Sequence, residues 1–99
     1  MIRTKDEILR ILRENKEAVQ QFGVRRLGLF GSASKGEAKE NSDLDFLVEF
    51  DRKSFDSYFD LKMFLEELFK SRVDLVIKET IKPRLREAIL NEVIYAPGL

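Results

Sequence analysis

Two aspartates, Asp43 and Asp45, stand one residue apart and follow a Gly31–Ser32 pair after ten intervening residues. Because side chains in a strand alternate between the two faces of a sheet, both carboxylates are expected on one side. Carboxylates held that close repel each other unless a cation lies between them, and Mg²⁺ is the simplest such cation. A glycine at a strand end permits close backbone approach to a phosphate, and Ser32 adds a hydroxyl and an N–H. The spacing indicates a metal-assisted phosphoryl- or nucleotidyl-transfer site.

A third aspartate, Asp74, lies in an otherwise apolar segment, residues 72–77. A carboxylate in such a segment is costly unless it is paired or bound to a metal. If this strand lies beside the one that carries the paired aspartates, three carboxylates converge. They would suffice for two metals about 3.5–4 Å apart, an arrangement used for in-line displacement at phosphorus. An ion pair of Asp74 with Arg72 or Arg26 is the alternative.

Two polar residues near the turn are further candidates. Lys35 lies within the turn and could contact a triphosphate, although a solvated surface lysine fits the sequence nearly as well. Ser42 could orient Asp43 or simply begin the strand. Other basic residues are expected to be solvated: Arg25, Arg26, Lys39, Lys78, Lys82 and Arg84.

Several other chemistries are excluded by the sequence. It contains no cysteine and no histidine, which removes disulfides, zinc sites built on these residues, and Ser-His-Asp or Cys-His catalysis. The spacing from Gly31 to Gly36 is that of a Walker A loop, but Glu37–Ala38 follows where Lys–Ser/Thr is required. An EF-hand loop starting at Asp43 fails because Leu47 and Val48 occupy positions that need a ligand and a glycine.

The composition is that of one small globular domain covering residues 1–99. Hydrophobic residues make up 43% and charged residues 36%, and the 18 Lys plus Arg balance the 18 Asp plus Glu. With no net charge, a long nucleic acid is not expected as a partner, although a local basic patch stays open. The beginning of the chain is charged, and no apolar run has the length of a membrane span. We therefore expect a soluble, cytoplasmic protein without membrane contact.

The periodicity of apolar residues predicts the elements that position these side chains. The predicted order is α-β-β-α-β-α. It consists of a helical region at 4–23, which is one helix or two broken near Asn15, strands at 24–30 and 43–50, a helix from about 56, a strand at 72–77 and a helix opened by Thr80 and Pro83. Residues 93–96 form an extended tail. This order predicts an α+β fold in which helices flank a small mixed sheet.

Two details of the helices can be tested directly. In the last helix, Leu85 and Ile89 are expected to face inward. Around the preceding helix, aromatic residues outnumber what its inner face can use, so some belong to the core and others could form an exposed docking patch: Phe55, Tyr58, Phe59, Phe64 and Phe69.

The combined motif of Gly31–Ser32, Asp43 and Asp45, with Asp74 on a later strand, resembles that of the DNA polymerase β-type nucleotidyltransferase superfamily. The runs LFGS at 29–32, SDLDFLVEF at 42–50 and VDLVI at 73–77 are similar to those of its minimal nucleotidyltransferases, the MNT proteins of prokaryotes. The resemblance spans about residues 20–96. It implies a polymerase β palm-like fold in which the Gly–Ser pair holds the nucleotide phosphates and the three aspartates bind Mg²⁺.

A substrate and a partner also follow from this resemblance. MNT proteins are commonly encoded with a helical HEPN toxin that has ribonuclease activity, and they act as its antitoxin. Characterised members transfer AMP from ATP to a tyrosine hydroxyl of the toxin. Many relatives have Arg where this chain has Lys35, which keeps the charge but loses the bidentate fork. Two alternatives stay open: an antitoxin that acts by binding alone, and a small-molecule nucleotidyltransferase of the aminoglycoside-modifying type. A homo- or hetero-oligomer is also open.

Overall fold

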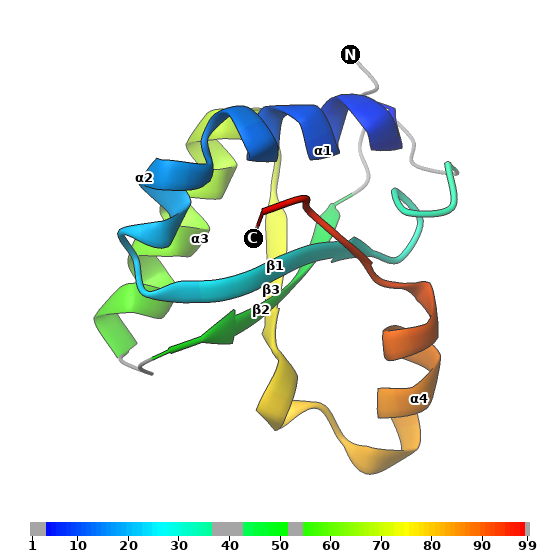
Figure 1. Ribbon diagram of the computed structural model, residues 1–99. Helices are drawn as coiled ribbons and strands as arrows, with labels where there is room; N and C mark the ends of the chain where they lie inside the picture. The colour runs from blue at the N-terminus through cyan, green and yellow to red at the C-terminus, as the bar shows by residue number, and fades with distance from the viewer. Residues whose placement is uncertain (1–3, 37–42, 52–54, 99) are drawn as a thin grey trace.

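The computed structural model describes residues 4–36, 43–51 and 55–98, and Ser42 and Lys39 lie outside these ranges. Its centre is a four-stranded sheet in the order β3-β2-β1-β4, with helices packed against it (Figure 1). The strands are β1 (Val24–Phe30), β2 (Leu44–Phe50), β3 (Val73–Ile77) and β4 (Ile94–Tyr95). The predicted small mixed sheet flanked by helices is confirmed.

The strand directions make the sheet mixed. β1 pairs with both β2 and β4 in the antiparallel direction, while β2 and β3 are parallel. The parallel pair is joined through helix α3 (Phe55–Phe69), as a crossover between parallel strands requires. β4 was expected only as an extended tail. Its pairing with β1 at Gly28 and Leu29 makes it an edge strand.

The remaining helices are α1 (Lys5–Glu14), α2 (Lys16–Gln20) and α4 (Pro83–Glu92), with a short 3₁₀ helix, η1 (Lys78–Thr80), before α4. The break near Asn15 is confirmed, because this residue separates α1 from α2. The Thr4 hydroxyl caps α1 by accepting the N–H of Glu7 at 3.1 Å. None of the helices in the described part of the chain combines the length and apolarity needed to cross a bilayer.

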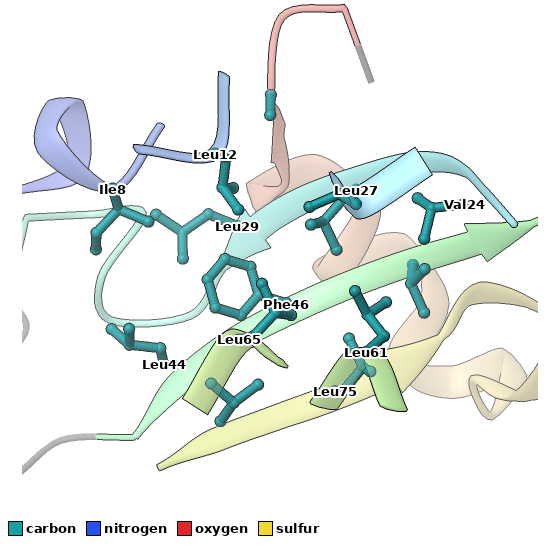
Figure 2. Packing of buried hydrophobic residues seen from close by; sticks show 14 of the residues in the cluster. Ile8, Leu12, Val24, Leu27, Leu29, Leu44, Phe46, Leu61, Leu65 and Leu75 are labelled. Atoms are coloured by element: carbon teal, nitrogen blue, oxygen red, sulfur yellow. The ribbon is translucent and has the colours of Figure 1, made fainter. Parts of the chain in front are cut away.

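The main core fills the face of the sheet that α1, α2 and α3 cover (Figure 2). It takes alternate side chains of β2, among them Phe46, whose ring centroid lies 5.6 Å from that of Phe69 in α3. The hydroxyl of Tyr58 donates to the Leu75 carbonyl at 2.7 Å, which ties α3 to β3. Burial of each large apolar side chain contributes about 1.5–3 kcal/mol, so this layer fixes which face of each strand points inward.

A second, smaller cluster lies on the opposite face of the sheet, where Leu47, Phe30 and Ile81 pack with Ile89 and Leu90 of α4. The prediction that Leu85 faces inward is wrong, because its side chain is 47% exposed. The beginning of α4 lies away from the sheet, and the helix approaches the sheet only toward its C-terminal end (Figure 1). Apolar cover is therefore available to Ile89 and Leu90 but not to the first turns.

The aromatic group on α3 divides between core and surface. Phe69 is buried and Tyr58 and Phe64 are half-buried. Phe59 is 44% exposed, and Met63 beside it on the helix is 65% exposed. Nothing is described for the side chain of Phe55. The outer face of α3 therefore carries a small apolar surface.

Candidate active site

Asp45 is the centre of the candidate site because it lies between the end of β1 and a second aspartate on β3. It pairs with Phe30, the last residue of β1, and with Asp74 of β3. Residues in register on neighbouring strands present their side chains on the same face. The carboxyl groups of Asp45 and Asp74 accordingly lie close enough to share a hydrogen bond when one of them is protonated. The turn that begins at Gly31 lies directly beside them.

Asp43 precedes β2 and is exposed. Its charge, like that of Asp74, acts on Asp45. Burial is the largest cause that raises the pKa of Asp45, followed by the charges of Asp74 and Asp43; together they bring it from the ordinary 3.8 to about 6. Asp45 and Asp74 thus lie together on the face of the sheet opposite the main core, and the charge of Asp43 acts on Asp45 from the start of β2.

Gly31 could not be replaced here without strain. Its φ is +73°, in the left-handed region that a residue with a Cβ rarely adopts. A Cβ built on Gly31 would collide with the Asp45 carboxylate. The absence of a side chain is what allows the backbone of the turn to lie against this carboxylate.

Hydrogen bonds within the turn hold its shape. The Ser34 hydroxyl donates to the Gly31 carbonyl at 2.8 Å, and the N–H of Lys35 donates to the Ser32 carbonyl at 3.2 Å. Ser34 is 6% exposed, while Ser32 is half-buried. Ser34 was not singled out from the sequence, because a serine in a Ser- and Gly-rich turn carries no distinguishing spacing.

Lys35 and Glu92 form an ion pair across this turn. The Lys35 Nζ lies 2.9 Å from Glu92 Oε1 at the end of α4. The hydrogen bond from Lys35 is the main cause that lowers the pKa of Glu92, and the backbone N–H of Gly31 adds to it. Glu92 was missed in the sequence, since only the fold brings the end of α4 to the end of β1.

In the described part of the chain, a metal ion would find suitable donors here but no complete protein cage. Among the residues that the structure describes, no group of three or more Asp, Glu, His or Cys side chains is arranged to hold an ion. Asp45 and Asp74 still supply two adjoining carboxylates whose negative charges a cation would neutralise. Mg²⁺ is commonly held by one or two carboxylates completed by waters and substrate phosphates. The donor set therefore fits a magnesium ion that arrives with a nucleotide.

A second charged cluster lies farther along the same face, around the buried Glu49. Its carboxylate accepts from Arg25 Nη2 at 3.3 Å and lies 3.6 Å from Lys78 Nζ and 3.9 Å from Arg26 Nη1. Consecutive strand residues normally point to opposite faces. The register of β1 shifts between Val24 and Arg26, and this irregularity lets both arginines reach one carboxylate.

Comparison with known proteins agrees with this geometry. Residues 6–96 match the family model described as a nucleotidyltransferase domain. The protein adenylyltransferase MntA of Thermococcus cleftensis is 44% identical over 94 residues, covering 93% of this chain and 95% of the relative. A solved structure described as a candidate minimal nucleotidyltransferase has 43% identity and a TM-score of 0.73, over 87% of this chain and 93% of that one. A toxin–antitoxin structure with AMP-PNP has 25% identity and a TM-score of 0.68, over 96% and 73% of the two chains.

The fold and the match over most of the chain define the class: a nucleotidyltransferase enzyme. Within that class, the chain belongs to the minimal nucleotidyltransferase family.

Proposed function

We propose that this chain, as a single domain over residues 1–99, transfers AMP from ATP to a tyrosine hydroxyl of a partner HEPN toxin and thereby acts as its antitoxin. The observation that carries the proposal is the position of Asp45, between Asp74 on one strand and the Gly31 turn on the other side. Two carboxylates beside a tight glycine turn support a site in which acidic metal ligands and a phosphate-binding turn act together. The names of the relatives, a protein adenylyltransferase and a toxin–antitoxin pair with AMP-PNP, support the same activity.

Each residue has a distinct task in this proposal. Gly31 lets the backbone approach a phosphate, and the Ser32 N–H and hydroxyl are available to its oxygens. Lys35 supplies an ammonium that pairs with the triphosphate, and Ser42 orients Asp43. Asp43, Asp45 and Asp74 would hold Mg²⁺, with two ions as the expected number. When bound, magnesium neutralises phosphate charge and lowers the pKa of a coordinated hydroxyl.

The partner follows from what the described fold contains. The sheet and its helices are used to build the core and the carboxylate site, and the described residues include no separate layer to hold an acceptor. An acceptor presented by another protein fits this arrangement, and the exposed Phe59 and Met63 offer it apolar contact. The balanced net charge does not favour a long nucleic acid.

The experiment is to incubate the purified chain with ATP, MgCl₂ and the protein encoded by the neighbouring open reading frame, and to weigh the partner by intact mass spectrometry. We expect the partner to gain the mass of one or more AMP groups. Asp45→Asn should lower the rate at least about a hundredfold, because it weakens stabilisation of charge in the transition state. Asp60→Asn, which removes an exposed aspartate from α3, is the matched control and should keep full activity.

Two results would contradict this activity. An unmodified partner in the presence of the wild-type chain would count against transfer. If an Asp43→Asn/Asp45→Asn double variant still neutralised the toxin in cells, binding alone would replace catalysis as the antitoxin mechanism.

A further inference from the structure

Glu92, the last residue of α4, reaches across to the turn at the end of β1. Its Oε1 lies 2.9 Å from Lys35 Nζ, and the backbone N–H of Gly31 lies near enough to help lower the pKa of its carboxyl group. The charge of Glu92 acts on Asp45 as well, so the three carboxylates and this fourth one share a neighbourhood. The Glu92 carboxylate therefore pairs with a lysine of the candidate active site and lies close to the backbone N–H of Gly31.

The two groups next to the Glu92 carboxylate are of the types that bind phosphate. Backbone N–H groups of a tight turn and a lysine ammonium both pair with anionic oxygens. A carboxylate offers oxygens of the same charge sign to the same donors. We propose that the Glu92 carboxylate holds the place of a nucleotide phosphate in the Gly31–Lys35 turn and is displaced when the nucleotide binds. This inference rests on the proposed function, which assigns a nucleotide to that turn.

Stability alone does not account for the position of Glu92. The side chains of Lys35 and Glu92 are 51% and 30% exposed, and ion pairs in such surroundings contribute little. Glu92 also stands at the C-terminus of α4, where the helix dipole disfavours a negative charge. Its repulsion with Asp45 adds a further cost. A carboxylate that is locally unfavourable in two respects is easily displaced.

Displacement exchanges one anion for another at the same donors. The phosphate takes the Gly31 N–H and the Lys35 ammonium, and Glu92 moves toward solvent, to which it is already partly exposed. Ile89 and Leu90 keep α4 on the sheet through their own apolar contacts, so the helix does not need this ion pair to stay in place. Glu92 would thus keep Lys35 positioned before the nucleotide arrives, and would weaken nucleotide binding by competing with it.

The test is titration calorimetry of the full chain with AMP-PNP in MgCl₂, comparing the wild type with Glu92→Gln. We expect Glu92→Gln to lower the dissociation constant about two- to fivefold, which is the range that the loss of one exposed ion pair allows. Glu87→Gln, an exposed glutamate on the same helix, is the matched control and should leave the dissociation constant unchanged. Thermal unfolding should show nearly equal midpoints for all three proteins.

A double-variant cycle with Lys35→Ala separates competition from a general charge effect. If Glu92 competes for Lys35, the gain in AMP-PNP affinity that Glu92→Gln gives should be smaller in the Lys35→Ala background. Equal gains in both backgrounds, or binding by Glu92→Gln that is no tighter than the wild type, would overturn the inference. Should Glu92→Gln not fold, Glu92→Asp shortens the side chain by one methylene and should give a smaller gain in the same direction. A wild-type chain that does not bind AMP-PNP would overturn the proposed function, and this inference with it.

Discussion

At the scale of single residues, Asp45 shows how a site can be costly to the fold that carries it. Burial and the charges of Asp74 and Asp43 raise its pKa from 3.8 to about 6. Between these two values the folded chain binds more protons than the unfolded chain, so its free energy of unfolding falls as pH rises through this window. Above pH 6 the full destabilisation caused by ionised Asp45 is present, and below pH 3.8 it is absent.

Asp45→Asn should therefore stabilise the metal-free protein at pH 7.5. Because the carboxylate is only partly buried and screened by solvent, we expect a gain of about 1 kcal/mol. Urea unfolding in EDTA at pH 7.5 and pH 4.5 measures it, and the gain should be smaller at the lower pH. Asp60→Asn is the control for loss of one carboxylate. A loss of stability on Asp45→Asn at pH 7.5 would contradict this account of the site.

Local patterns singled out the aspartates and the glycine that the structure brings together at Asp45, but not the residues around them. Asp43 and Asp45 were found by their spacing on an alternating strand, and Gly31 by its place at a strand end. Asp74 stood out as a carboxylate among apolar residues. No local sequence pattern pointed to Glu92, because its contact with Lys35 depends on how α4 returns to the sheet. Ser42 lies outside the described residues, and its role stays a prediction.

At the scale of elements, Glu49 connects parts of the chain that the sheet alone holds loosely. It joins β2 to Arg25 and Arg26 of β1 and to Lys78 of η1, and it accepts the Tyr95 hydroxyl of β4 at 3.4 Å. β4 has only two paired residues with β1. The guanidinium of Arg26 also lies 3.6 Å from the centroid of the Tyr95 ring. These contacts attach the edge strand where few backbone bonds are available.

Glu49→Gln should lower the free energy of unfolding by about 1–2 kcal/mol, since charge-assisted hydrogen bonds contribute more than neutral ones. The value stays below that of a fully buried ion pair because the arginine partners remain half exposed. Urea unfolding at neutral pH measures it. Glu67→Gln, which breaks the exposed pair with Lys70, is the matched control and should leave the free energy of unfolding nearly unchanged. Equal losses in the two variants would show that burial of Glu49 adds nothing.

The elements were predicted well where periodicity is strong and less well where tertiary contacts decide. β1 has the predicted bounds, and β2 begins at Leu44, one residue after the predicted start at Asp43. Apolar residues recur through most of both segments, which is why the sequence locates them closely. β4 could not be distinguished from an extended tail, since two residues carry no period. Leu85 was assigned inward on helical spacing alone, and the spacing does not tell how far the sheet extends beneath the helix. The irregularity in β1 has no sequence signal either.

At the scale of the whole molecule, the sheet separates two tasks. One face carries the main core under α1, α2 and α3, and the other carries the small cluster under α4 and the carboxylate site beside it. The charge repulsion on the second face lowers stability, and a cation bound there would relieve it. Folding and metal binding are therefore expected to be linked.

MgCl₂ should raise the thermal midpoint of the wild-type chain. At ten times the dissociation constant, a ligand that binds only the folded state adds about 1.4 kcal/mol, which is roughly 6–10 °C for a domain of this size. Scanning calorimetry at constant ionic strength measures the shift, and EDTA should reverse it. The Asp45→Asn/Asp74→Asn variant removes the two adjoining carboxylates and should show no shift. An equal rise in this variant would mean that magnesium binds elsewhere.

The parallel register of β2 and β3 has a consequence for how such a chain can change. Asp45 lies opposite Asp74, and the next pair along, Phe46 and Leu75, is buried in the main core. A slip of one residue would expose Leu75 and drive Asp74 into hydrocarbon. Packing of Phe46 and Leu75 in the main core thus fixes the register that keeps Asp45 and Asp74 side by side on the opposite face. The connection between β2 and β3 can therefore change in length during evolution. A homologue that keeps this core packing also keeps the two carboxylates paired.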